Sequence, residues 1–209
     1  MNEKQAKAAI EAMVLLSKVS LDGYEKLSKE FPEVDFNKKG LLMVGQSMAG
    51  VTAAREEMHL VADYGVPGQD LSPDEIRAME PALTGELKGG VYFPEEAHGE
   101  PLKIVQALAK KAQALGVDLR EEVEFQEARI KNGKIESIKT SAGDFTADSY
   151  VLATGSWSTE LGKQLKLNVP ILGGKGYAMI VPPLSIQPTH PMMLVEKKVA
   201  ITPDRKSTR

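Results

Sequence analysis

The stretch SYVLATGSWS, residues 149–158, has the composition expected where a cofactor meets the end of a strand. Tyr150 to Ala153 form an apolar run that predicts a buried parallel strand, and the small residues Thr154 and Gly155 follow it directly. In doubly wound sheets ligands bind beyond the carboxyl ends of strands, and a glycine there lets a phosphate or a ring approach the backbone. An ordinary strand-to-helix turn also favours Thr-Gly, so the residues alone leave both interpretations open.

Two further glycine-containing stretches do not match nucleotide-binding loops. In GQSMAGVT, residues 45–52, Val51 stands where a phosphate loop places its lysine, so a plain strand-to-helix turn is expected. In GGKGYAM, residues 173–179, Met179 replaces the third glycine of a dinucleotide fingerprint, and Pro182-Pro183 prevents a following helix. Neither stretch therefore predicts a nucleotide site.

The titratable residues form no catalytic constellation. Adjacent carboxylates occur at Glu56-Glu57, Glu95-Glu96 and Glu121-Glu122. Neighbouring side chains on a helix or strand point apart, so these pairs are interpreted as solvated faces. The three histidines, His59, His98 and His190, lack metal-ligand spacing. We expect no metal site and no catalytic side chain. His98 lies in a loop that opens a helix, where it either contacts a polar ligand group or is simply exposed.

Composition excludes several classes of function. The 209 residues include no cysteine, which removes disulfides, thiolate nucleophiles and zinc-thiolate sites. The 26 basic and 29 acidic residues show no basic cluster with aromatics, so nucleic acid is not an expected partner. The amino-terminal 20 residues carry charges throughout, which is typical of neither a signal peptide nor a membrane span. The expected location is the cytoplasm.

The elements that must position these residues are well punctuated in the first half of the chain. Ser72, Pro73 and Glu75 form the start signal of a helix, a capping box with proline at the first helical position. Gly116 is expected to end another helix as a C-cap. Periodicity predicts helices over residues 3–30, 48–64 and 100–115, and strands over 40–44 and 89–93.

The second half of the chain predicts mainly strands. Alternating apolar and polar residues favour strands at 117–120, 122–131, 134–140 and 144–153, with two-residue turns at Asn132-Gly133 and Ala142-Gly143. Asn-Gly between alternating runs is the strongest hairpin signal in the chain. A short helix over 158–165, a strand over 169–183 and two short strands within 192–205 complete the pattern.

Five stretches in order resemble one family. They are GVP (65–67), MEPAL (79–83), GGVYFPEEAHGEPLKIVQALAKKAQALGV (89–117), YVLATGSWSTEL (150–161) and VPILGGKGYAMIVP (169–182). Together they resemble the D-amino-acid dehydrogenase and glycine oxidase branch of the FAD-dependent amine oxidoreductases, the DAO family. The resemblance covers almost the whole chain from about residue 55, and the order and spacing are more specific than any single motif.

The resemblance implies a mixed α/β (α+β) fold. It consists of a partial Rossmann-type FAD-binding domain and a DAO-type substrate domain with a mixed or antiparallel sheet. Carried over, residues 94–168 belong to the FAD-binding domain and residues 20–93 and 169–209 to the substrate domain. Residues 1–19 form a helix at the junction.

The resemblance also implies residues for each ligand. The strand containing Val123 is similar to the segment whose backbone meets the adenine of FAD, and Ala153, Thr154, Gly155 and Trp157 match the segment beside the pyrophosphate and ribitol. Tyr177 and His98 are the implied substrate-binding residues. A strand tyrosine packed at a domain edge is the alternative for Tyr177.

The implied reaction is oxidation of an amino acid to an imino acid and then a keto acid, by hydride transfer to the flavin, with no acid-base side chain required if the amine arrives neutral. The expected substrate is a D-amino acid, with glycine, sarcosine or another secondary amine as alternatives. The electron acceptor is oxygen or a quinone, the latter implying a peripheral contact with a membrane.

The chain departs from the family at both ends. It has neither the opening G-x-G-x-x-G turn nor the closing segment with the substrate-binding arginine, so we expect an internal fragment that binds FAD weakly or not at all and is inactive alone. The competing hypothesis is a free-standing, non-catalytic α/β binding or interaction module.

Overall fold

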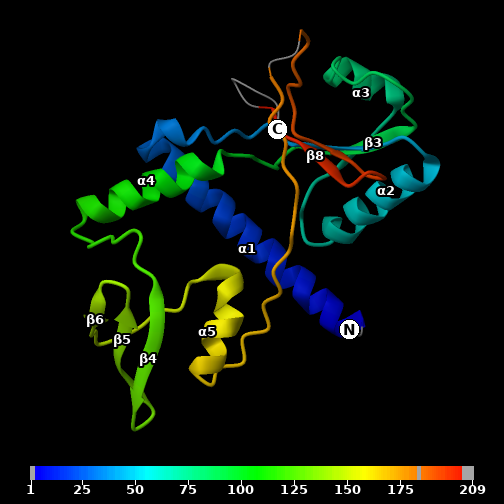
Figure 1. The fold of residues 1–209 in the computed structure, drawn as a ribbon. Coiled ribbons are helices and arrows are strands. Elements are labelled where there is room, and N and C mark those ends of the chain that lie inside the picture. Colours follow the sequence, from blue (N-terminus) through cyan, green and yellow to red (C-terminus); the bar gives the residue numbers. More distant parts are fainter. Residues whose placement is uncertain (1–2, 183–184, 204–209) are drawn as a thin grey trace. The chain divides into compact units, whose positions relative to one another are not determined.

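Two β-sheets organise residues 3–182 and 185–203, the part of the chain that this computed structural model describes (Figure 1). Each sheet lies in its own structural unit. The first unit comprises Met1–Lys111 and Ala178–Arg209, and the second comprises Ala112–Tyr177. The chain thus leaves the first unit once and returns to it. The assignment of substrate and FAD-binding domains to these parts of the chain stays a prediction.

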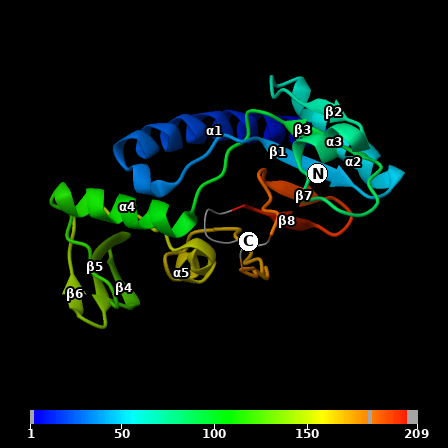
Figure 2. The same cartoon turned by 90° about the horizontal axis from the view of Figure 1, so that it is seen from above.

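The sheet of the first unit is mixed, as the predicted fold class requires. Its described strands are β1 (Leu41–Gly45), β2 (Gln69–Leu71), β3 (Gly89–Phe93), β7 (Met192–Leu194) and β8 (Val199–Ile201), in the order β2-β3-β1-β7-β8. The central strand β1 is antiparallel to β3 and parallel to β7 (Figure 2). Of these strands, the sequence patterns did not indicate β2.

The core of the first unit forms on both faces of β1. Leu42 and Val44 point into one apolar cluster that includes Ile76 of α3 (Pro73–Met79), whereas Met43 points into a second cluster that includes Ala54 of α2 (Met48–Ala62). A central strand covered on both faces reads as a continuous apolar run, which explains why residues 40–44 were recognisable.

Local capping signals set the helix starts. The predicted capping box is present: the Ser72 amide donates to Glu75 Oε2 at 2.8 Å, and the Glu75 amide donates to Ser72 Oγ at 3.4 Å. The helices α1 (Glu3–Glu30) and α4 (Pro101–Ala114) match the predicted ranges, and a single 3₁₀ turn, η1 (Pro32–Val34), follows α1. Within the described residues, no helix is both long enough and apolar enough to span a membrane.

The second unit is built on a β-hairpin. Strands β4 (Phe125–Lys131) and β5 (Lys134–Thr140) pair antiparallel through the predicted Asn132-Gly133 turn, where both residues have positive φ. β6 (Gly143–Phe145) adds a third strand, and its turn lies at residues 141–142, one residue earlier than predicted. A 3₁₀ turn, η2 (Gly155–Trp157), leads into α5 (Ser158–Gln164).

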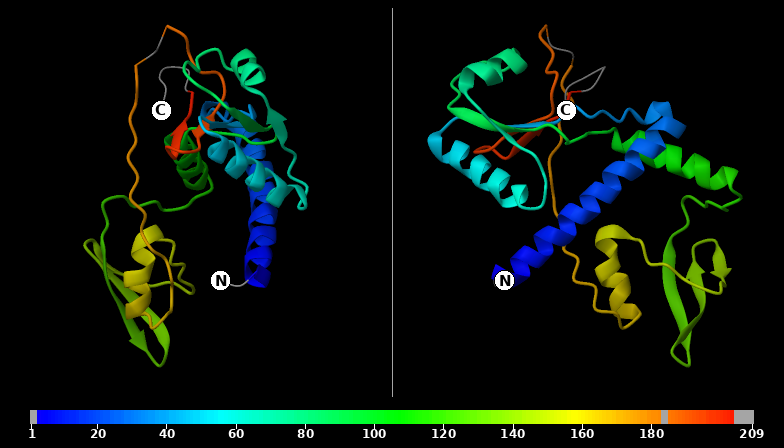
Figure 3. Two further views of the ribbon diagram at one scale, coloured as in Figure 1. Left: turned by 90° about the vertical axis from the view of Figure 1, so that its right-hand side faces the viewer. Right: turned by 180° about the vertical axis from the view of Figure 1, so that it is seen from behind.

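Three strand predictions were wrong. Residues 117–120 and 150–153 form no strand, and neither do residues 169–180 of the predicted strand 169–183, whose last position lies outside the described residues. Figure 3 shows the segment after α5 as an extended trace without an arrow. Val151 is 90% exposed and Leu172 is 94% exposed, so these apolar runs are not buried. A strand is stable only beside a hydrogen-bonding neighbour, and the described part of the chain places none next to these segments.

Candidate functional site

His98 lies in the loop between β3 and α4, where backbone pairing holds it. It forms an isolated antiparallel bridge with Asn37: the Asn37 amide donates to the His98 carbonyl at 2.8 Å, and the His98 amide donates back at 2.9 Å. These two bonds attach the loop to the segment that precedes β1. His98 is therefore held in place by its backbone, in the loop where the sequence analysis left ligand contact and simple exposure as alternatives.

A cavity of about 750 Å³ opens beside His98, entirely within the first unit. Four segments line it: the approach to β1, the start of α4, the approach to β7 and the end of β8. The lining residues are Asp35, Asn37, Lys39, His98, Gly99, Glu100, Pro101, Gln187, Pro188, Thr189, Thr202 and Pro203. The volume falls in the range of small-molecule sites.

The imidazole of His98 is suited to contact a ligand. Its Nδ1 is buried and has no hydrogen-bond partner among the described residues. Burial lowers the pKa of His98, the cation of Lys39 lowers it further, and Asp35 opposes both effects. The ring is therefore neutral at pH 7 and offers one donor and one acceptor. Because Nδ1 is closed off from solvent and has no described partner, any contact with a ligand in the cavity must come from the rest of the His98 ring.

Charged groups of both signs surround this cavity. Asp35, in a left-handed conformation at φ 57°, forms an ion pair with Lys103 at 3.5 Å and accepts a hydrogen bond from Asn37 Nδ2 at its carbonyl at 3.0 Å. Lys39 brings a cation, and Glu100 brings a second carboxylate. The wall thus carries one cation and two carboxylates, and the Asp35 carboxylate is already paired with Lys103.

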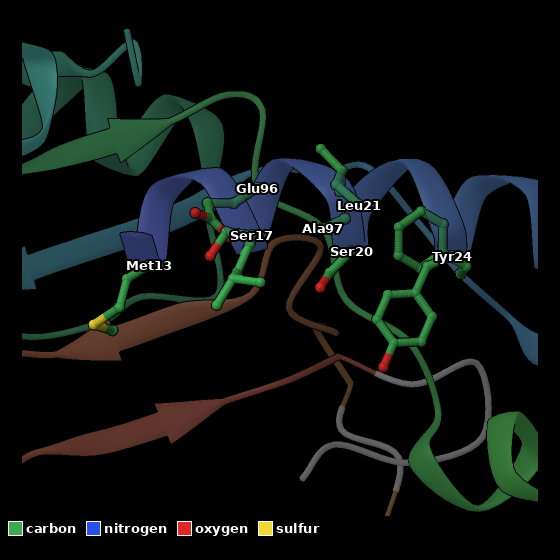
Figure 4. A pocket seen from close by; sticks show the side chains of 9 residues that line it. Met13, Ser17, Ser20, Leu21, Tyr24, Glu96 and Ala97 are labelled. Atoms are coloured by element: carbon green, nitrogen blue, oxygen red, sulfur yellow. The ribbon is translucent and has the colours of Figure 1, made fainter. Parts of the chain in front are cut away.

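A second, shallower cavity of about 360 Å³ lies along α1. Figure 4 shows Glu96 and Ala97, from the loop between β3 and α4, beside Ser17 and Ser20 of the helix. Apolar side chains form the rest of its wall, including Met13, Leu16, Leu21, Tyr24 and Phe36. Partial burial raises the pKa of Glu96, although the residue as a whole remains exposed. With one carboxyl and few other polar groups, this groove is the weaker candidate.

The predicted cofactor-binding turn lies in the second unit. Thr154 Oγ1 and Ser158 Oγ are 3.0 Å apart, and this contact ties the residue before η2 to the start of α5. Gly155 has φ of +56°, and a Cβ added there would meet no atom within 4 Å. Ala153 is exposed, and Trp157 is 73% exposed. The turn therefore presents an open backbone flanked by an accessible indole.

Two other predicted site residues also lie in the second unit. Val123 is half-buried and precedes β4 instead of lying within a strand. Tyr177 is 90% exposed in the extended segment, with Lys175 Nζ 5.7 Å from the centre of its ring. His98 and Tyr177 thus belong to different units.

The sequence patterns missed two carboxylates with specific partners. Glu196 Oε1 accepts hydrogen bonds from the amides of Gln46 and Ser47 at 3.0 and 2.8 Å and from Ser47 Oγ at 2.7 Å. Burial would raise its pKa, but these hydrogen bonds hold it at about 2. The stretch GQSMAGVT therefore binds an anion from its own chain. Glu80, the other carboxylate, is buried and accepts hydrogen bonds from Thr189 and His190, and no local signal identifies either pair.

Sequence similarity relates the chain to a known family and to curated proteins. The family model described as "FAD dependent oxidoreductase" (DAO) matches residues 3–208. The chain is 33% identical over 196 residues to a D-amino acid dehydrogenase of Bradyrhizobium diazoefficiens, covering 91% of this chain and 47% of that protein. It is 34% identical over 170 residues to a D-amino acid dehydrogenase of Vibrio atlanticus, covering 79% and 41%. The chain spans about half the length of these relatives.

Solved structures share the fold. The glycine oxidase of Geobacillus kaustophilus superposes with a TM-score of 0.80 at 23% identity, over 93% of this chain and 53% of that one. The L-proline dehydrogenase of P. horikoshii superposes with a TM-score of 0.74 at 21% identity, over 91% and 52%. The predicted fold class is confirmed by this likeness.

Proposed function

This chain belongs to the FAD-dependent oxidoreductase (DAO) family, and from that membership we propose that its protein oxidises an amino acid, a D-amino acid first among the candidates, with FAD as the cofactor. The observation that carries the proposal is the match to two proteins named D-amino acid dehydrogenase over most of this chain. When bound, FAD supplies the electron acceptor for the hydride that leaves the substrate Cα.

The turn at residues 153–157 is the proposed contact for the cofactor. Open space at Gly155 lets a flat or phosphorylated group approach the backbone, and a side chain at this position would fill that space. The exposed indole of Trp157 offers an apolar surface beside it. The geometry therefore fits a nucleotide cofactor along Ala153, Thr154, Gly155 and Trp157, and Val123 is proposed to contact the adenine.

The cavity beside His98 is the proposed substrate end. Its neutral imidazole and the hydroxyl of Thr202 would hydrogen-bond a small polar ligand, while Lys39 would attract its carboxylate. The chain's part is binding and orientation, and no side chain is proposed as an acid or base, because an amine that arrives neutral needs none. Tyr177 is proposed as a further substrate contact.

The electron acceptor completes the proposal. We propose a quinone as the electron acceptor, which a cytoplasmic protein would reach by binding to the surface of a membrane. Molecular oxygen is the competing acceptor. Anaerobic turnover of the natural-source protein with D-alanine and a soluble quinone tests this choice. Activity that requires oxygen and does not respond to the quinone would identify oxygen as the acceptor instead.

Titration with FAD tests the cofactor contact directly. Trp157 is the single tryptophan of the chain, so all indole emission in the titration comes from this turn. We expect weak quenching in the wild-type chain and at least a tenfold loss of affinity in Gly155→Val. Gly116→Val is the matched control, because Gly116 also has positive φ and open space in the same unit. Equal quenching in wild type and Gly155→Val would remove this turn from the cofactor site.

Substrate oxidation needs a separate assay. The relatives are about twice as long, so flavin reduction is followed in the protein from its natural source, with a panel of D-amino acids, glycine and sarcosine. Reduction by one of these compounds supports the proposal and ranks the substrates. No reduction by any of them, together with no FAD binding, would favour the non-catalytic binding module.

A further inference from the structure

Glu80 is a fully buried carboxylate that forms hydrogen bonds with a segment lining the His98 cavity. It is the C-cap residue of α3 and is 0% exposed. Its Oε2 accepts three hydrogen bonds from the segment before β7: from the Thr189 amide at 2.7 Å, from Thr189 Oγ1 at 2.9 Å and from the His190 amide at 2.9 Å. Thr189 itself lines the cavity. Glu80 therefore fixes both the backbone and the hydroxyl of a lining residue.

The same contacts determine the tautomer of His190. The Thr189 hydroxyl has one proton, and it donates that proton to Glu80. Towards His190 Nδ1, 2.9 Å away, the hydroxyl oxygen can only accept. Nδ1 also lies 3.4 Å from Glu80 Oε2. The imidazole must therefore carry a proton on Nδ1, which leaves Nε2 as the acceptor when the ring is neutral.

Stability alone gives little reason for this arrangement. Burial would raise the pKa of Glu80, but the hydrogen bonds from Thr189 and His190 outweigh it and hold the pKa below its usual value. The carboxylate is thus charged at neutral pH while its Oε1 has no hydrogen-bond partner within the described residues. A buried charge with one unsatisfied oxygen costs folding free energy relative to an apolar side chain. What the buried carboxylate provides is two hydrogen bonds that restrain Thr189 and one that restrains the His190 amide.

We propose that Glu80 is a positioning residue for the His98 cavity, acting through Thr189 and through the Nδ1-protonated tautomer of His190. The inference rests on the proposed function, in which this cavity receives the substrate. Glu80 touches no ligand. It sets where the Thr189 hydroxyl and amide lie in the wall. The imidazole of His190 also forms a T-shaped contact with Tyr92, with ring centres 6.1 Å apart.

Imidazole NMR of the nitrogen-15-labelled chain tests the proposal. Only His59, His98 and His190 contribute ring signals, and His190→Gln identifies one of them. We expect His190 in the Nδ1–H tautomer in wild type and in the ordinary Nε2–H-dominated mixture in Glu80→Gln. Glu86→Gln is the matched control: Glu86 is exposed and pairs only with its near neighbour Lys88 at 2.6 Å, so its loss should leave His190 unchanged.

A second pair of variants shows whether a change in tautomer comes from the lost contact or from misfolding of Glu80→Gln. Thr189→Val removes the hydroxyl and keeps the buried carboxylate, whereas Thr189→Ser restores the hydroxyl. We expect loss of the Nδ1–H preference in the first and its recovery in the second. The same tautomer in wild type, Glu80→Gln and Thr189→Val would overturn the proposal.

Ligand titration links the tautomer to the cavity. With FAD present, D-alanine should shift the Thr189 amide in wild type, with at least tenfold weaker affinity in Glu80→Gln and no change in Glu86→Gln. Equal affinity in wild type and Glu80→Gln would overturn the positioning role. If D-alanine shifts no signal in wild type, the substrate assignment of the cavity fails, while the tautomer comparison still decides whether Glu80 positions Thr189.

Discussion

The two structural units obtain their order in different ways. In the first unit the strands β1, β3 and β7 contribute side chains to apolar clusters, and Leu42, Val44, Val91 and Met192 are at most 2% exposed. In the second unit, none of the described apolar side chains is buried, and the buried residues there are Ser137, Thr140, Ser158 and Gly162. The first unit is held by its core, and the second by turns and ladder hydrogen bonds.

The two proposed binding sites lie in units that differ in how they are stabilised. A three-stranded sheet with exposed faces is marginally stable and depends on its turn residues. The open backbone at Gly155 belongs to this unit, whereas the His98 cavity belongs to the unit with the core. The proposed substrate cavity thus has a rigid frame of its own, and the proposed cofactor turn does not.

Truncation of the core should give the largest effect and the sharpest contrast. Leu42→Ala in β1 should lower the free energy of unfolding by about 3 kcal/mol, because it leaves a cavity between packed side chains. Ile130→Ala in β4 should cost less than about 1 kcal/mol, since Ile130 is 45% exposed. Urea denaturation followed by circular dichroism measures both. Similar losses would contradict the comparison.

The stability of the β4–β5 hairpin should depend on the backbone conformation of its turn. Gly133 has φ of +74°, so Gly133→Ala should destabilise the hairpin by about 1 kcal/mol. Hydrogen exchange of the β4 and β5 amides measures the loss, which should leave the β1 and β3 amides unaffected. The control is Gly174→Ala, where an added Cβ meets open space without positive φ. Unchanged exchange in Gly133→Ala would show that the turn does not hold the second unit.

The smallest expected effect concerns Glu196 and is dependent on pH. Its pKa is lowered to about 2 in the folded chain from an ordinary value near 4.5, so its charged form stabilises the fold. This contribution is complete above about pH 4.5 and is lost as the pH falls towards 2. At pH 7 the free energy of unfolding of wild type should exceed that of Glu196→Gln by about 0.5 kcal/mol, a value typical of an exposed carboxylate at a helix start. Denaturation of both proteins at several pH values measures this difference. A difference that stays the same between pH 7 and pH 2 would show that ionisation of Glu196 does not stabilise the fold.

Family membership was recognisable from the sequence because the stretches that carry it are contiguous and keep their order. The capping box at Ser72 and Glu75, the helices α1 and α4, and the Asn132-Gly133 hairpin were also predicted and confirmed. Each of these features depends on residues a few positions apart. Among the proposed site residues, the structure places His98 at a cavity, and the cofactor assignments remain predictions.

What the sequence determined by itself is the set of elements whose stabilising contacts are local: caps, turns and amphipathic periodicity. Only the tertiary structure decided which apolar runs become strands, so Leu41–Gly45 forms the centre of a sheet while residues 150–153 form no strand. It also decided that Glu80 meets Thr189 and that Glu196 meets Ser47, pairs separated by 109 and 149 positions. The physical reason is that a strand or a buried carboxylate is stabilised by partners distant in the chain, which no short pattern of residues specifies.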